Sequence, residues 1–403
     1  MKIRVTVFVC SLSLLSGFTC QDSVFNATYG PGIARSVKIV DGGYLVTGVD
    51  GSHYEREGFL LKFSHDGSPM WKNTFKYHGI YDSWIEAVFE TPQSYQFWGF
   101  ACPANCFTFW GEADKTTGQA VRSGLCDPDL GNLMSIAHVT DDEYIIYFQN
   151  HSQLARVNGQ CEFLAKSYIA ESGDRFDRIQ TIGDKLILTG TYYYEFEPNV
   201  WSDTAKILVL EEDGYGWKKL WSYFAPLHLS YPEKLDNIYR FLGARINNDG
   251  SYLAVGYNGG LSFGICGFTL FSPEGQLLFN EDFDITYTHC EQAPVIGSDM
   301  IAVTGVDGGG TDAFHWIISF PDIPGGTPST VSYYEVYGSD VGQGSHGITA
   351  TVPVFDGIFG YVSVGYSKDE SYNSQIWVVN TDSDGFAPSP AVDRSGEVEV
   401  PQE

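Results

Sequence analysis

The stretch DGGYLVTG, residues 41–48, recurs along this 403-residue chain. Clear copies are NDGSYLAVG (248–256), SDMIAVTG (298–305), GDKLILTG (183–190) and IFGYVSVG (358–365), and weaker copies are QSYQFWGF (93–100) and DDEYIIYF (141–148). Each copy is a β-rich run of alternating or continuous apolar residues. A period of roughly fifty residues indicates a repeat architecture rather than a series of unrelated domains.

Each repeat contains enough sequence for four strands. In the first repeat the motif is followed by GFLLKFS (58–64), a turn with glycine and SPMWKNTF (68–75), and one further strand precedes it. Four-stranded units of this length that stack radially form β-propellers. We therefore expect an all-β fold, a seven-bladed β-propeller of four-stranded antiparallel blades. A stacked sandwich array is an alternative, as is a six-bladed ring in which 162–171 forms a short helix.

The two ends of the repeat region complement each other. The segment 386–403 is too rich in proline and charge to be a strand, so the last repeat lacks its outer strand. VFNATYG (24–30) has no repeat before it, and we expect this N-terminal strand to complete the last blade and close the ring. The expected organisation is a signal peptide at 1–20, a single β-propeller domain at 21–386 and a disordered acidic tail at 387–403.

The first repeat and the start of the second carry a family resemblance. DGGYLVTG, GFLLKFSHDGSPMW (58–71) and GIYDSWIEAVFET (79–91) resemble the repeat of secreted bacterial-type β-propeller proteins. In that class a D-G-G-Y run ending in glycine precedes an apolar strand with lysine, a D-G or N-G turn and a tryptophan. Many of its members have no assigned activity, so the resemblance implies a fold and export rather than a reaction.

The N-terminal segment predicts a secretory signal peptide. Lys2 and Arg4 precede an apolar run from Val5 to Leu15, which is too short to span a bilayer. No later stretch approaches the length of a membrane span. The formal net charge of −27 repels the phosphate backbone of nucleic acids. We therefore expect a secreted, extracellular monomer with no nucleic-acid partner and no membrane span.

Cysteine usage supports the same compartment. Six cysteines follow the leader: Cys102, Cys106, Cys126, Cys161, Cys266 and Cys290. An even number in a secreted chain indicates disulfides, and we favour sequential pairing. A zinc site at Cys102 and Cys106 would lack a second pair of ligands. Asn26 and Asn150 stand in N-glycosylation sequons.

The stretch NTDSDG (380–385) resembles the first half of a calcium loop, because Asn380, Asp382 and Asp384 alternate before a glycine. Ala391 stands where a complete loop requires a bidentate glutamate. Other repeats also carry a glycine at this place, where a tight hairpin needs a positive φ. We therefore favour a turn, keep these three residues as a calcium candidate and expect no other cofactor.

Polar and aromatic residues concentrate in the connections that open on one face of a propeller, between blades and between second and third strands. They are His78, Asp82, Trp84, His228, Tyr231, Glu233, Asp236, His289, Glu291, Asp340 and His346. Such a combination of aromatic rings, carboxylates and imidazoles suits a glycan, a peptide or a cation. We expect Tyr192, Tyr193, Tyr194 and Trp201, in a long loop of the fourth repeat, to extend this surface.

These residues indicate a non-enzymatic secreted protein that binds an extracellular ligand, carbohydrate or protein, through this face. A secreted glycan hydrolase is the first alternative, with Asp82, Asp236 or Glu291 as acid and base. A structural matrix or surface-coat scaffold is the second.

Three arginines fall near the expected inner strands, Arg35, Arg178 and Arg245. Their offsets from the repeat motif differ, which argues against a converging arginine cluster of the kind that sialidases use.

Overall fold

The structure is a computed structural model. It describes residues 24–51, 56–76, 82–102, 106–127, 133–140, 142–148, 153–168, 173–197, 200–213, 216–224, 240–247, 249–260, 263–282, 288–292, 295–296, 300–307, 313–319, 329–336, 347–354, 360–368, 373–381 and 392–393. For 166–168, 194–203, 245, 257–266, 281–360, 368 and 392–393, the description covers the backbone alone. Every regular element in this part of the chain is a strand, so the all-β prediction is confirmed. No helix there is long and apolar enough to cross a membrane.

The first four sheets along the chain each contain four antiparallel strands in sequence order. The first sheet is β2 (Ile33–Val40), β3 (Gly43–Asp50), β4 (Glu57–Phe63) and β5 (Pro69–Phe75). The second is β6 (Ser83–Glu90), β7 (Ser94–Ala101), β8 (Phe107–Asp114) and β9 (Ala120–Leu125). The third is β10 (Leu133–Thr140), β11 (Glu143–Phe148), β12 (Gln153–Asn158) and β13 (Phe163–Tyr168). The fourth is β14 (Asp174–Ile182), β15 (Lys185–Glu197), β16 (Val200–Glu212) and β17 (Trp217–Phe224).

Three further sheets follow, and the last includes strands from both ends of the described chain. The fifth sheet is β18 (Arg240–Ile246), β19 (Tyr252–Gly260), β20 (Phe263–Phe271) and β21 (Leu277–Asp282). The sixth is β22 (Thr288–Gln292), β23 (Val295–Ile296), β24 (Met300–Asp307), β25 (Ala313–Ser319) and β26 (Ser329–Val336). The seventh is β27 (Gly347–Val354), β28 (Gly360–Lys368), β29 (Ser374–Thr381), β1 (Phe25–Pro31) and β30 (Val392–Asp393).

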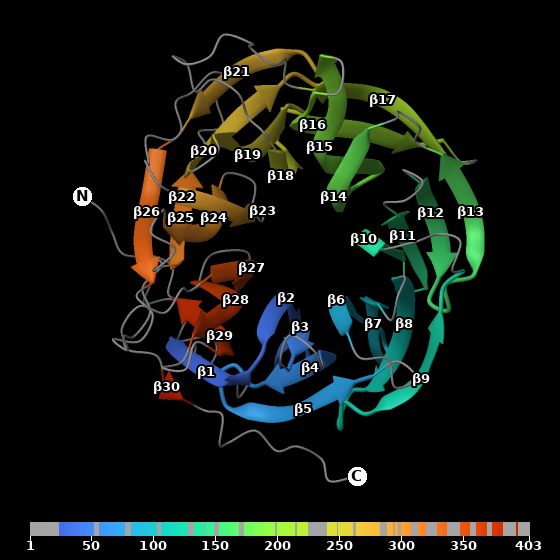
Figure 1. Cartoon of the computed structure of the whole chain (residues 1–403), viewed down its shortest axis with the longest axis vertical. Coiled ribbons are helices and arrows are strands. Elements are labelled where there is room, and N and C mark those ends of the chain that lie inside the picture. Colours follow the sequence, from blue (N-terminus) through green and yellow to red (C-terminus); the bar gives the residue numbers. More distant parts are fainter. Residues whose placement is uncertain are drawn as a thin grey trace, which may run out of the picture.

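The sheets are arranged radially around a common centre (Figure 1). In the first five sheets, the first strand lies nearest the centre and the fourth lies at the outside (Figure 1). In the sixth sheet β26 is the outer strand, and in the seventh sheet β27 lies at the centre and β30 at the outer edge. Hydrophobic cores form between neighbouring sheets; one combines Leu45, Leu60 and Trp71 of the first sheet with Val88 and Phe97 of the second. The first four sheets therefore bury both faces against their neighbours, which explains why their second and third strands read as continuous apolar runs.

The glycine that ends the repeat motif permits a close approach between the two inner strands. Gly48 of β3 pairs with Ala34 of the innermost strand β2. A Cβ at Gly48 would lie 2.1 Å from the carbonyl oxygen of Ile33, a distance that no side chain tolerates. The repeated glycine therefore positions the strand that faces the centre.

The glycine turns between third and fourth strands dock onto the preceding sheet. In the second sheet, Gly118 has φ +70°, and a Cβ there would lie 2.4 Å from the Trp71 ring of the first sheet. The Asn73 side chain donates a hydrogen bond of 2.8 Å to the Thr117 carbonyl of the same turn. The glycine and the tryptophan of the repeat thus form one contact between consecutive sheets.

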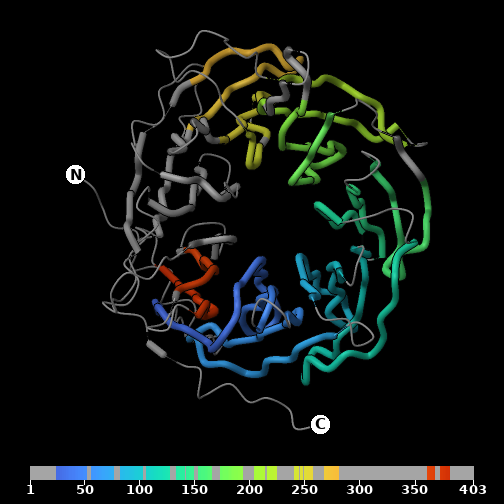
Figure 2. The backbone as a smooth tube through the Cα atoms, viewed as in Figure 1, coloured from blue at the N-terminus to red at the C-terminus, as the bar shows by residue number. Residues whose placement is uncertain are grey.

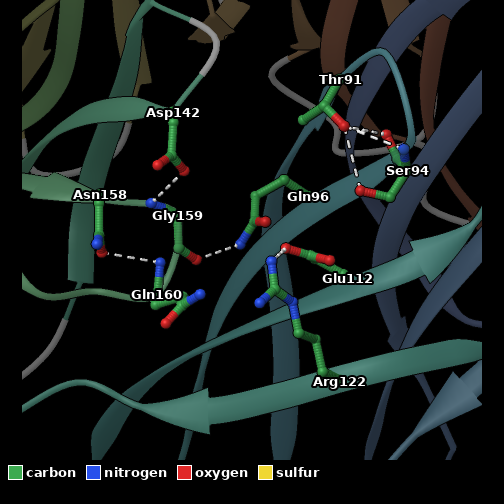
Figure 3. A network of polar contacts seen from close by, with 9 residues as sticks. All are labelled: Thr91, Ser94, Gln96, Glu112, Arg122, Asp142, Asn158, Gly159 and Gln160. Atoms are coloured by element: carbon green, nitrogen blue, oxygen red, sulfur yellow. Dashed lines mark hydrogen bonds and ion pairs between the residues drawn. The ribbon is translucent and has the colours of Figure 1, made fainter.

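The same turn of the third sheet is held by polar groups (Figure 3). Gln96 of the second sheet donates to the Gly159 carbonyl at 2.7 Å, and Asp142 accepts from the Gly159 amide at 3.0 Å. A disulfide between Cys126 and Cys161 adds a covalent link between these two sheets. The third repeat therefore forms this turn at the same place as the other repeats, although its sequence motif differs from theirs.

The N-terminal strand β1 pairs antiparallel with β29 of the last repeat, as the sequence predicts. The buried Trp377 indole donates a hydrogen bond of 2.7 Å to Asn26 Oδ1. Asn26 is buried, so the fold does not present this sequon asparagine at the surface. The Tyr29 hydroxyl donates to the Gly67 carbonyl of the first sheet at 2.6 Å, so β1 receives the glycine turn that follows it.

Three expectations need correction. The segment 162–171 contains strand β13, paired with β12, and not a helix. The expected fourth-repeat loop around Tyr192 and Trp201 is instead an extension of β15 and β16, which pair over their whole length. Within the expected C-terminal tail, Val392 and Asp393 form β30, parallel to β1. In all three places, pairing with a neighbouring strand overrides the local sequence signal.

The sequential disulfide prediction is met wherever side chains are described. Cys102 and Cys106 are bonded, and so are Cys126 and Cys161. The side chains of Cys266 on β20 and Cys290 on β22 lie outside the described residues.

Candidate functional site

Each innermost strand carries one extra residue at an equivalent position, where its pairing with the second strand shifts register. These residues are Arg35, Glu86, Met134, Asp177, Leu242, Glu291 and Thr349. A bulge re-aims side chains and bends the strand, and bulges concentrate next to functional sites. The bulges fall in the first half of each strand, near the end of the ring where the chain enters from the preceding sheet. We call this end the loop face.

Two of the predicted ligand-binding residues lie together at the loop face, Asp82 and Trp84 at the start of β6. His289 and Glu291 lie on β22, where the backbone alone is described, and Glu291 is the bulge residue of that strand. The other predicted rim residues fall outside the described part of the chain: His78, His228, Tyr231, Glu233, Asp236, Asp340 and His346.

Arg56, Asp82, Trp84 and Phe100 form a cluster at this face, which we call the Trp84 cluster. The half-buried rings of Trp84 and Phe100 lie 4.7 Å apart between centroids and 31° from parallel. The Arg56 guanidinium lies over the Trp84 ring at 5.3 Å, and its Nε is 4.0 Å from Asp82 Oδ1. The cluster combines an aromatic surface with a cation and a carboxylate, the groups that bind and orient polar ligands.

The backbone holds this cluster in one conformation. The amides of Asp82 and Ser83 both donate to the Arg56 carbonyl at 3.0 Å, and the Cys102 amide donates to the Asp82 carbonyl at 2.9 Å. Asp82 has φ +87°, an uncommon value for a residue other than glycine. The Cys102–Cys106 disulfide closes the adjacent connection between β7 and β8. An unusual backbone angle fixed by surrounding bonds is a frequent feature of functional sites.

The fourth and fifth sheets present related groups at the same level. Arg175, two positions before the bulge of β14 as Trp84 is in β6, lies over the Tyr193 ring at 4.5 Å. Arg240 occupies the same position on β18 and forms an ion pair of 2.8 Å with Asp177, the bulge residue of β14. Cations and aromatic rings thus continue around the loop face beyond the Trp84 cluster.

Charged groups from different sheets also meet deeper in the ring. Loss of hydration raises the pKa of Glu86, and the Arg35 guanidinium of the first sheet partly opposes this rise. Loss of hydration likewise lowers the pKa of Lys38 on β2, and the positive charge of Arg178 on β14 lowers it further. Burial lowers the pKa of Arg178 itself to about 10. The Lys38 ammonium lies 5.6 Å from the centre of the Phe89 ring on β6.

The calcium candidate is only partly within the described residues. Asn380 is buried in β29, whereas Asp382 and Asp384 lie outside the description. In the part of the chain that the structure describes, no group of three or more His, Cys, Asp or Glu side chains gathers as a metal site would require.

Sequence reasoning found Asp82 and Trp84 but missed Arg56, Phe100 and Arg175. Phe100 ends the weak motif copy QSYQFWGF, at the end of the second strand of its sheet. Because this end pairs with the start of the first strand, its position opposite Trp84 was the signal that could have identified it. The convergence of Lys38 and Arg178 had no local signal, because the two residues are separated by more than two repeats.

No protein-family model and no curated protein sequence matches the chain. Among solved structures, Drosophila Semaphorin 2a is similar with a TM-score of 0.54 and 8% identity, over 89% of this chain and 75% of that one. Sqt1 from Chaetomium thermophilum gives a TM-score of 0.53 and 12% identity, over 90% and 98%. The WD40 domain of Neurospora crassa Pan2 gives 0.52 and 10%, over 87% and 89%. At such identities the likeness shows the fold alone, and that fold is propeller-like.

Proposed function

We propose that this chain is a secreted seven-bladed β-propeller that binds an extracellular ligand, a glycan or a protein, through its loop face. The pairing of β1 with β29 and the docking of the first glycine turn onto Tyr29 support a ring closed by the N-terminal strand. The two disulfides are compatible with an extracellular protein. The resemblance to secreted bacterial-type propeller repeats supports the same proposal.

The Trp84 cluster is the observation that carries the binding function. Aromatic rings that are partly exposed, backed by a fixed backbone and flanked by Arg56 and Asp82, provide a stacking surface beside hydrogen-bonding groups. Apolar contact combined with a few convergent polar groups is the general composition of a binding site. The extended hairpin of β15 and β16 adds Tyr193 at the same face, and β14 adds Arg175 over its ring.

The first test is retention of the mature protein on a panel of extracellular glycans, with the masses of any products measured in the same experiment. We expect intact, retained glycan and a loss of about tenfold or more in affinity for Trp84→Ala, because truncating an aromatic anchor costs on the order of 1.4 kcal/mol or more. Phe279→Ala is the matched control, since Phe279 is an exposed aromatic residue on the outer strand β21. Circular dichroism verifies that both variants fold.

The results of the glycan experiment distinguish glycan binding from protein binding and from a scaffold role. Unchanged binding by Trp84→Ala contradicts the choice of this surface. If no glycan is retained, the ligand is a protein, or the chain is a structural scaffold, and a cross-linking search with Trp84→Ala as the negative control decides between them.

A secreted glycan hydrolase is the second candidate, and Glu86 favours it. A carboxyl group whose pKa is raised by loss of hydration holds its proton to a higher pH than an ordinary glutamate does, which is the direction of change that a general acid needs. Cleaved products in the glycan experiment that disappear in Glu86→Gln would support this function in place of simple binding.

A further inference from the structure

The loop face of the fourth and fifth sheets carries two arginines at equivalent positions. Arg175 on β14 and Arg240 on β18 each stand two residues before the bulge of their strand. The two strands contact each other and lie side by side at the inside of the ring, β14 in green and β18 in yellow (Figure 2). The Arg240 guanidinium pairs across this contact with Asp177 of β14 at 2.8 Å. The two arginines therefore belong to one surface, formed where neighbouring sheets meet.

Arg175 differs from Arg240 because no carboxylate neutralises it. The Arg175 side chain is exposed, and it forms no ion pair with any described residue. Its own strand carries two aspartates, but both have another partner. Asp174 is buried and lies 2.7 Å from Lys206. Asp177 is the partner of Arg240. Arg175 thus presents an uncompensated positive charge in a chain with 50 acidic and 23 basic residues.

The half-buried Tyr193 ring holds the guanidinium of Arg175, whose central carbon lies 4.5 Å from the ring centre. Arg175 pairs with Thr191 across the strands, and Tyr193 follows Thr191 by two positions, so both side chains project from the same face of the sheet. The Tyr193 amide donates to the Gly173 carbonyl at 2.8 Å. Gly173 has φ +107°, and a Cβ there would lie 2.1 Å from the Tyr193 carbonyl oxygen. The backbone of Tyr193 is therefore fixed by a close approach that only glycine permits.

Arg175, Tyr193, Asp177 and Arg240 form a surface that we call the Arg175 platform. An arginine stacked on an aromatic ring keeps its N–H donors in the guanidinium plane, where they form a planar fork. This fork matches the two oxygens of a carboxylate or a sulfate group. Because the ring already restricts the side chain, binding costs little additional conformational entropy. The Arg175 platform therefore suits an anionic group of a ligand.

We propose that the Arg175 platform binds an anionic group of the loop-face ligand, and that this ligand is an acidic glycan with carboxylate or sulfate groups. The proposal rests on the function proposed above, in its glycan form, and names the class of sugar. The Trp84 cluster supplies an aromatic surface for sugar rings, and the Arg175 platform supplies the charge that selects acidic sugars. The net charge of −27 repels such a ligand at long range, so its affinity depends on these short-range contacts.

Calorimetric titration of the full chain with polygalacturonate and with its fully methyl-esterified form tests the proposal, because the two polymers differ in the charge of their carboxyl groups. A sulfated galactan and its desulfated form, measured in the same way, test sulfate as the anionic group. We expect the wild type to bind at least one acidic form about tenfold more tightly than its neutral counterpart. Arg175→Gln should bind both forms equally. Arg175→Lys should recover part of the preference, because lysine restores the charge but not the planar fork.

Arg122→Gln is the matched control. Arg122 also lies over an aromatic ring, that of Trp110 at 5.8 Å, but it pairs with Glu112 on the outer strands. Its replacement removes the same charge from the chain and should leave the preference for the acidic form unchanged. Trp84→Ala should weaken the acidic and neutral forms by the same factor, because it removes an aromatic surface and no charge. Circular dichroism verifies that each variant folds.

Failure of this proposal is distinguishable from failure of the loop-face function. If the wild type binds acidic and neutral forms equally and Trp84→Ala binds neither, glycan binding stands and the selection of acidic sugars is wrong. A preference for the acidic form that persists in Arg175→Gln also overturns the proposal. If no glycan binds, both proposals fail in their glycan form. Polyglutamate that is then bound by the wild type and not by Arg175→Gln would identify an acidic protein as the ligand instead.

Discussion

Cations inside the sheets and cations at the centre of the ring have different surroundings. Between the strands of the fourth sheet, Lys206 and Asp174 are both 1% exposed and lie 2.7 Å apart. In the first sheet, Lys72 lies 2.7 Å from Asp50 and also donates to the Pro31 carbonyl at 3.2 Å. At the centre, by contrast, Lys38 and Arg178 lack such a partner among the described side chains.

The difference separates cations that are paired with a carboxylate from cations that are not. A buried cation inside a sheet must be neutralised within the protein, because no solvent or ligand reaches it. Changes at the paired sites should therefore reduce stability strongly, and a change at Lys38 should have little effect on stability.

The largest expected effect is at the buried pair. Asp174→Ala leaves the Lys206 ammonium buried without its carboxylate and should reduce the free energy of unfolding by about 3–5 kcal/mol. Urea denaturation followed by circular dichroism measures it. The double variant Asp174→Ala/Lys206→Met should recover part of this loss, because it removes both charges. A loss below about 1 kcal/mol for Asp174→Ala would remove the contrast with the centre.

The next effect concerns the covalent link between the second and third sheets. Replacing Cys126 and Cys161 by serine opens a loop with a sequence separation of 35, which should reduce the free energy of unfolding by roughly 3–4 kcal/mol. Replacing Cys102 and Cys106, with a separation of 4, should cost about 2 kcal/mol. Denaturation of both double variants tests the order, and equal losses would show that the long link contributes no more than the local one.

The smallest effect on stability is expected at the centre. The pKa of Lys38 is lowered from 10.5 in the folded chain, so the charged ammonium destabilises the fold at neutral pH. Above the folded pKa and below 10.5, the unfolded state retains a proton that the folded state has released, and stability rises with pH. Lys38→Met should be as stable as the wild type or slightly more so at neutral pH, and this difference should shrink as pH rises.

Denaturation curves of wild type and Lys38→Met, from neutral pH upward, measure this difference. Arg122→Gln serves as control, because an exposed ion pair contributes under about 1 kcal/mol and its loss should leave the pH dependence unchanged. A marked loss of stability in Lys38→Met at neutral pH would show that Lys38 stabilises the fold. The contrast between cations at the centre and cations inside the sheets would then be wrong.

The sequence alone determined the features that depend on short stretches of chain. The motif DGGYLVTG and its copies predicted the second strands, the glycine turns predicted the hairpins, and VFNATYG predicted the strand that pairs with the last repeat. Each follows from local periodicity or from the φ that a turn requires. Asp82 and Trp84 were found for the same reason, because the end of a strand at a loop is visible in the sequence.

Only the tertiary structure decided which side chains meet. The register places Arg35 at the bulge of its strand, Arg178 one residue after the bulge and Arg245 three residues after it, so the three arginines do not occupy equivalent positions. The influence of the Arg178 charge on the pKa of Lys38 depends on how the sheets are arranged around the centre (Figure 1). Strand pairing and sheet packing involve residues far apart in the chain, so no local pattern encodes them.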